Sequence, residues 1–177
     1  MEQSPKETED EVVRIPIDSS MFAIADEFLS RIVDDERREE YKNFIIKGRE
    51  GALQYATWML ERVAGNGEAL LGEDTEERLE KDQTHGLNQA SSYITLTLAK
   101  IGGPSFVIPS KKLERENALG RAALEYAETT LEKFQEELEL TGDPEKAAEA
   151  VGIRDVSLLS KLLEAKSRLP KGAIFGK

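Results

Sequence analysis

The sequence predicts a mainly α-helical protein, and three observations lead to that fold class. Apolar residues recur at three- and four-residue intervals over most of the chain, which is the spacing of one buried helix face. Charged residues make up 33% of the 177 positions, as expected of helices with solvated outer faces, and extended backbone is favoured only in short segments. With 39% apolar residues the chain can bury one modest core, so we expect one domain with subdomains.

The N-terminal part begins with an acidic tail and a short extended segment. Residues 1–11 have no apolar period, and we expect them to be disordered. Residues 12–17 favour a strand, which Pro16 restricts to a sheet edge because proline has no backbone N–H to donate. One of the residues 18–20 then caps a helix whose apolar face is formed by Met21, Ile24, Phe28 and Ile32.

Two further helices are predicted before residue 65. An Asp-Asp step at 34–35 separates the first helix from a second, which carries Tyr41, Phe44 and Ile45. A third helix ends at the Gly-Asn-Gly turn at 65–67 and carries Leu53, Ala56, Leu60 and Val63. The polar residues 72–83 are either a solvated helix capped by Thr75 or a mobile connector.

Residues 87–100 fit two kinds of secondary structure. Their apolar positions suit a helix, whereas residues 93–98 also alternate like a strand. We favour a helix that ends at the Gly102-Gly103 pair. Residues 106–108 then form a short strand, which pairs either with its own copy across a dimer axis or with residues 12–17.

The longest predicted helix runs from Ser110 to about Leu140. Its outer face is rich in glutamate and should be solvated. Its apolar stripe is formed by Leu113, Leu124, Leu131, Phe134 and Leu138, backed by Ala122, Ala123 and Ala127.

Residues 142–168 have the pattern of two short helices joined by a tight turn. Asp143 suits the N-cap of the first helix, and Pro144 suits its first position, where a missing N–H has no cost. Gly152 can adopt the left-handed backbone that ends this helix, and Asp155 caps the second. The residues that pack the corner and the second helix are Ala147, Ala148, Ile153, Leu158, Leu159, Leu162 and Leu163. The segment therefore predicts a helix-turn-helix.

The intervals in this segment resemble the C-terminal DNA-binding unit of the Fis family over about residues 125–168. The matching positions are Gly142, Ala147, Ala148, Gly152, Ile153, Leu158, Lys161 and Leu162. The resemblance implies a helix-turn-helix whose second helix lies in the major groove of DNA. Asp155 and Glu164 depart from the family, in which a DNA-binding helix is more often neutral or basic there. Similar folds also serve as protein-binding modules.

A weaker resemblance extends over about residues 101–168. The segment Ile-Gly-Gly-Pro-Ser-Phe-Val-Ile-Pro-Ser at 101–110 looks like the Gly-Gly-x-x-Val-Tyr-Ile-Pro strand of the phage Mor/C transcription activators. It implies a dimer in which a helical dimerisation region precedes the strand and a helix-turn-helix follows. We accordingly divide the chain into the tail at 1–11, a helical association region at 12–103, and a segment at 104–177. That last segment contains the strand near 105–108, the long helix and the helix-turn-helix.

If the second helix docks as the resemblance implies, its exposed residues contact DNA. Arg154, Ser157, Ser160 and Lys161 would approach base edges, while Lys166, Arg168 and Lys171 would hold phosphates. The net charge of −11 opposes DNA binding, but residues 151–177 carry +4 and the other 150 residues carry −15. Because screening at physiological salt acts over about 8 Å, the basic end can meet DNA while the acidic body points away. The alternative is that these cations only follow helix C-termini and a solvated tail.

The sequence predicts no enzyme, no cofactor and no metal site. His85 is the only histidine and has no partner at ligand spacing, and the chain has no cysteine. Paired carboxylates at 76–77 and 136–137 lie in charged helical runs that are typical of solvated surface. Because no apolar run is long enough for a bilayer and the N-terminus is acidic, we expect neither a membrane helix nor a secretory signal, and a cytoplasmic location.

We therefore predict a DNA-binding protein, either a dimeric transcriptional regulator or a DNA-organising factor. Its partner would be double-stranded DNA, and a homodimer formed through the N-terminal helices would cover enough base pairs to be selective. One alternative is a helical adaptor or assembly protein, of viral origin for example, whose hairpin binds a protein partner. Another is an acidic inhibitor that mimics DNA, although the basic residues on the long helix dilute that signal.

Overall fold

The computed structural model describes residues 14–64 and 73–168, and these residues are mainly helical. The predicted fold class is therefore confirmed. The elements are β1 (Arg14–Pro16), α2 (Ser20–Leu29), α3 (Asp35–Ala64), α4 (Glu73–Lys100), β2 (Ser105–Val107), α5 (Lys112–Thr141), α6 (Pro144–Ala150) and α7 (Val156–Ser167).

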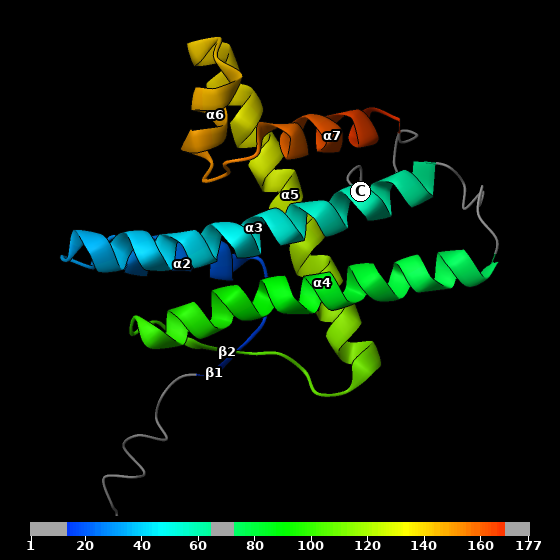
Figure 1. Ribbon diagram of the computed structural model, residues 1–177, viewed down its shortest axis with the longest axis horizontal. Coiled ribbons are helices and arrows are strands. Elements are labelled where there is room, and N and C mark those ends of the chain that lie inside the picture. The colour runs from blue at the N-terminus through cyan, green and yellow to red at the C-terminus, as the bar shows by residue number, and fades with distance from the viewer. Residues whose placement is uncertain (1–13, 65–72, 169–177) are drawn as a thin grey trace, which may run out of the picture.

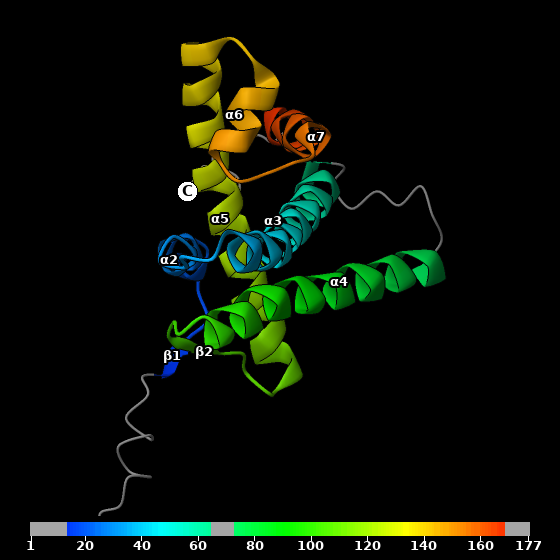
Figure 2. The same cartoon turned by 60° about the vertical axis from the view of Figure 1, so that its left-hand side comes forward.

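The long helices α3 and α4 lie antiparallel and side by side (Figure 1). The equally long α5 crosses both of them, and α6 and α7 lie at one end of the molecule, with α7 along α3 (Figure 2). One cluster of buried side chains includes residues from all six described helices. The C-terminal helices therefore share a core with the N-terminal ones.

Helix α3 corrects the prediction of two separate helices between residues 35 and 64. It continues through Gly48 and Gly51 although glycine weakens a helix interior. Both glycines face α4 at close range. A Cβ at Gly51 would lie 2.5 Å from the Cβ of Ala90, and one at Gly48 would lie 2.6 Å from Cγ1 of Ile94. The missing side chains allow the close packing of two helices, and this packing offsets the poor helix propensity.

Helix α4 confirms the helical interpretation of residues 87–100. It already begins at Glu73, so the polar stretch is part of the helix rather than a mobile connector, and Thr75 lies inside the first turn instead of preceding it. Gly102 ends the element in the left-handed conformation, with φ of 88°. The next amide, of Gly103, donates to the carbonyl of Leu98 at 2.8 Å.

The two strands form a small parallel sheet in which Ile15 pairs with Phe106. This is the second of the two pairings considered for residues 106–108. Beyond the strand, the amide of Ile17 donates to the carbonyl of Val107 at 3.3 Å. Ile17 and Phe106 are buried, so the sheet attaches both ends of the α2–α4 region to the core.

The buried faces of α2 and α5 differ from the predicted stripes. In α2 the buried residues include Phe22, whose ring stacks on Tyr126 with centroids 3.9 Å apart, whereas Ile24 and Phe28 are only partly buried. In α5 Leu113 is 70% exposed, and Leu119 and Tyr126 are buried instead. Leu113 lies in the first turn of α5, before the helix reaches the core.

Some predictions lie outside the described residues: the disorder of 1–11, the turn at 65–67 and the role of Lys171. Within residues 14–64 and 73–168, no helix has both the length and the apolar character needed to cross a bilayer.

Candidate functional site

The helix-turn-helix corner begins with the local contacts that the sequence predicts. Gly142 follows α5 with a φ of 68°, and its amide donates to the carbonyl of Leu138 at 2.7 Å. The carboxylate of Asp143 accepts from the amide of Glu145 at 3.0 Å, and Pro144 is the first residue of α6. These contacts end the long helix and begin the next within three residues.

The turn between α6 and α7 also forms as predicted. Gly152 has a φ of 79°, and Ile153 is buried while its amide donates to the carbonyl of Ala148 at 3.0 Å. Asp155 caps α7 by accepting from the amide and hydroxyl of Ser157 at 3.1 and 2.6 Å. The described residues thus include a helix-turn-helix with both helices capped.

Helix α7 is packed on α3 along its length (Figures 1 and 2). Its buried residues are Leu158, Leu159, Leu162 and Ala165. The exposed positions follow one stripe on the opposite side, at Ser157, Ser160, Lys161, Glu164 and Arg168. The helix can therefore present one face to a ligand, while the other face is part of the core.

Two consecutive residues of α3 hold the turn between α6 and α7. Arg49, 5% exposed, donates from Nη1 to the carbonyl of Val151 at 3.3 Å, where α6 ends. Glu50 accepts through Oε2 from the amides of Arg154 and Asp155 at 3.0 and 3.1 Å, where α7 begins. A cation thus meets the C-terminus of one helix and an anion the N-terminus of the next, as their dipoles favour.

Arg49 also fixes α2 against this corner. Its Nη2 donates to the carbonyl of Phe22 at 2.9 Å and pairs with Oδ1 of Asp26 at 2.6 Å. Burial opposes the charge on Arg49, but the Coulombic effects of Tyr126 and Asp26 and hydrogen bonds to both outweigh it and raise its pKa. A Cβ at Gly152 would lie 2.3 Å from Nη1, so glycine there also makes room for the guanidinium.

The residues predicted to approach base edges are not equally available. Ser157, Ser160 and Lys161 are exposed along α7. Arg154 is exposed as well, but its guanidinium donates to Oδ1 of Asn43 and lies 3.8 Å from Oε2 of Glu39. The structure therefore directs the first of these four side chains toward α3.

The residues predicted to hold phosphates are separated in the same way. Lys166 is half-buried, and Arg168 is exposed and pairs with Glu164 at 2.9 Å across one helical turn. Residues 142–168 contain five acidic and five basic side chains. A depression at the corner is lined by Glu145, Glu149, Ile153, Arg154, Asp155, Val156 and Ser157, so carboxylates outnumber cations there.

No protein-family model matches the chain, and neither a curated protein nor a solved structure shows significant similarity to it. Any functional assignment therefore depends on the residues themselves.

Sequence reasoning missed Arg49 and Glu50. Both belong to a charged-looking helix, and their neighbours Ile45, Ile46 and Ala52 are buried. The only signal in the sequence is that these two charges interrupt an otherwise apolar stretch between two glycines. Their partners are about a hundred positions away in the chain, which no local pattern reveals.

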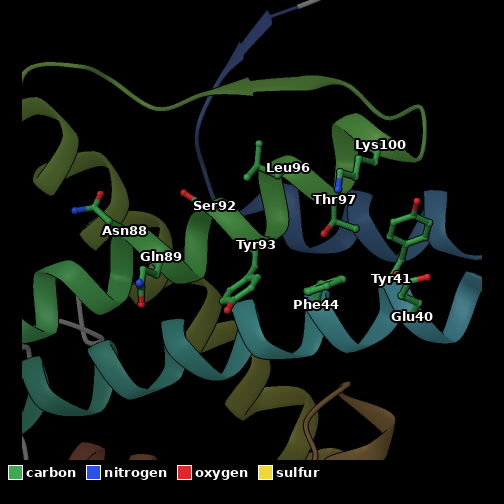
Figure 3. Close-up of a pocket in the computed structure, with 10 residues that line it drawn as sticks. All are labelled: Glu40, Tyr41, Phe44, Asn88, Gln89, Ser92, Tyr93, Leu96, Thr97 and Lys100. Atoms are coloured by element: carbon green, nitrogen blue, oxygen red, sulfur yellow. The ribbon is translucent and has the colours of Figure 1, made fainter.

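A second surface feature is an exposed hollow of about 520 Å³ between α3 and α4, here called the α3–α4 groove. Figure 3 shows Phe44 and Tyr93 in its middle, Asn88 and Gln89 toward one end, and Tyr41 and Lys100 toward the other. The rings of Phe44 and Tyr93 stack with centroids 5.9 Å apart. The apolar lining is formed by Tyr41, Phe44, Tyr93 and Leu96, and the polar lining includes Glu40, Ser92, Thr97 and Lys100.

The described residues offer no cluster of three or more histidine, aspartate or glutamate side chains that could hold a metal ion. His85 lies exposed on α4.

Proposed function

We propose that the chain is a DNA-binding protein that contacts duplex DNA with the exposed stripe of α7. The observation that carries the proposal is the capped helix-turn-helix, in which Ser157, Ser160 and Lys161 lie exposed on one face of the second helix. Hydroxyl and ammonium groups in such a stripe are suited to base edges and phosphates. A transcriptional regulator or DNA-organising factor, acting as a dimer, remains the form of this function that we propose.

Binding of this kind would depend only moderately on electrostatics. Glu50 and Asp155 occupy the first amides of α7, which in other helix termini are free to bind anions. Lys161 and Arg168 are the exposed cations of the stripe, and the surface pair of Arg168 with Glu164 is of the kind that contributes less than about 1 kcal/mol. We therefore expect few phosphate contacts for each protomer and an affinity that dimerisation increases.

The test is fluorescence-anisotropy binding of the full chain to a pool of random duplex DNA over a salt series. The double variant K161A/R168A should bind at least about tenfold more weakly, and its slope of log affinity against log salt should fall by about 1.8 for two lost phosphate contacts. A chain ending at Leu140 is unsuitable as a control because it lacks the buried residues of α7.

The matched control is K111A/K112A, which removes two exposed cations near the start of α5. Its affinity should stay close to that of the unchanged chain. Equal losses in both double variants would mean that total charge and not the α7 stripe determines binding. No binding at low salt would reject the DNA-binding function.

A protein-binding adaptor is the second candidate, and one observation favours it. The α3–α4 groove exposes aromatic and aliphatic side chains that a monomer would ordinarily bury.

A further inference from the structure

We infer that the α3–α4 groove binds an acidic amphipathic helix of a partner protein. The groove is independent of the α7 stripe, and the two surfaces share no residue. Leu96 is 62% and Tyr93 37% exposed although both line the same hollow. Large apolar side chains that gather in this way on a charged protein mark an interaction surface.

The shape of the groove fits a helix. Its walls are two antiparallel helices, and its α4 side extends from Asn88 to Lys100. With a rise of 1.5 Å per residue this side is about 18 Å long, which is the length of about three helical turns. An amphipathic helix binds in such a groove through apolar residues at i, i+3 or i+4, and i+7.

The stacked pair of Phe44 and Tyr93 provides a place for one of these apolar residues. The two rings lie near the middle of the groove, with Leu96 beside them (Figure 3). Aromatic side chains at the centre of an interface commonly contribute most of the binding energy. The ends of the groove are polar, as the rim of a protein interface usually is.

Charge distinguishes an acidic partner from other occupants. The ammonium of Lys47 lies 5.9 Å from the ring centre of Phe44 and 5.7 Å from that of Tyr93. The guanidinium of Arg37 lies 5.7 Å from the ring centre of Tyr41, and Lys100 lines the groove. The acidic side chain in the lining is Glu40. The rim is therefore positive in a chain of net charge −11, and a helix with carboxylates beside its apolar stripe complements it.

Other occupants fit this surface less well. A second copy placed on the groove would bring two sets of the same cations together. Duplex DNA has no extended apolar surface to cover Leu96 and Tyr93.

The experiment measures binding of the full chain to two labelled helical peptides of about 14 residues, long enough to fill the groove. Both peptides carry the same leucines at i, i+3, i+4, i+7 and i+11, but one carries glutamates and the other lysines at the flanking positions. We expect the glutamate peptide to bind at least about tenfold more tightly, as charge complementarity requires. The charge-reversed variant K47E/K100E should prefer the lysine peptide, whereas K111E/K112E should keep the original preference.

The variant L96D should weaken binding of the glutamate peptide by about tenfold or more, because it removes an apolar contact and adds a repulsive charge. Its matched control is L140D, which changes a leucine that is 80% exposed at the end of α5. Equal affinity for both peptides, or equal effects of L96D and L140D, would overturn the inference. A dimer in light scattering that L96D converts to a monomer would also overturn it by assigning the groove to a second copy. Binding of oligo(dT) that L96D abolishes, with neither peptide bound, would assign it to single-stranded nucleic acid.

Discussion

Glu50 connects the stability of the corner with the chemistry that α7 can perform. Its carboxylate accepts from two amides at the beginning of α7, in the place where an N-terminal helix end would otherwise bind an anion. Arg154 lies beside it and donates to Asn43. The helix terminus that would approach DNA first is thus occupied by side chains of α3, and any contact with DNA must use the residues farther along the stripe.

The variant E50A should lower the free energy of unfolding by about 1 to 2 kcal/mol, the usual cost of losing a capping acceptor. E50Q should lose less, because the amide oxygen can still accept a hydrogen bond. Urea unfolding measures both. The control is E61A on the same helix, where an exposed carboxylate is lost and the change should stay within about 0.5 kcal/mol. Equal effects at the two positions would show that Glu50 does not cap α7.

Tyr126 should make stability depend on pH in the alkaline range. Burial raises its pKa above the ordinary value of about 10, although the nearby Arg49 lowers it in part. Below about pH 10 the phenol is neutral in both states and has no effect. Above about pH 10 the unfolded chain loses this proton before the folded chain does, so stability falls as pH rises toward the folded pKa.

Urea unfolding at about pH 8 and about pH 11, on either side of the ordinary tyrosine pKa, tests this dependence. Y126F should lose less stability between the two conditions than the unchanged chain. Y93F, which alters an exposed tyrosine of the α3–α4 groove, should lose as much as the unchanged chain. The same loss in Y126F and Y93F would contradict a role for the buried phenol.

At the scale of elements, the contact of α3 with α4 decides which glycines matter. Gly51 lies in a helix against Ala90, whereas Gly86 lies in a helix with open space at its Cβ position. In isolation both glycines reduce helix stability to the same degree. Their tertiary surroundings give the same substitution opposite expected signs.

G86A should raise the free energy of unfolding by up to about 1 kcal/mol through better helix propensity. G51A should lower it by about 1 to 3 kcal/mol, since the added methyl group would lie 2.5 Å from the Cβ of Ala90 and force the helices apart. Urea unfolding of the two single variants checks this difference. A stabilising G51A would mean that the helices are less closely packed than described here.

At the scale of the whole molecule, the C-terminal helices belong to the common core. Leu159 of α7 is fully buried, and α7 contacts α3 more extensively than it contacts α6. A helix-turn-helix on a flexible connection would unfold by itself. Here the contacts predict that the corner and the long helices unfold together.

The variant L159A should destabilise the protein by about 2 to 5 kcal/mol, as expected for a cavity in a packed core. Its unfolding is followed by far-UV circular dichroism and by fluorescence of Trp58, the single tryptophan, on α3. The two midpoints should shift together. A loss of helix signal before any change in Trp58 fluorescence would show that α6 and α7 unfold separately.

Local signals in the sequence were sufficient for the fold class, for most element ends and for the internal geometry of the corner. Asp143, Gly152 and Asp155 act on neighbouring backbone groups, so their roles can be predicted without knowledge of the rest of the molecule. The exposure of Ser157, Ser160 and Lys161 also followed from helical spacing. Contact of these residues with DNA stays a prediction.

Only the tertiary structure decided what each helix packs against. Local pattern divided α3 into two helices at its glycines, because the compensating contact with α4 comes from residues far along the chain. The same is true of the hold that Arg49 and Glu50 have on the corner, and of the groove that α3 and α4 form together. Caps and periodicity depend on backbone groups a few residues apart, whereas burial and ion pairing depend on residues that the fold brings together.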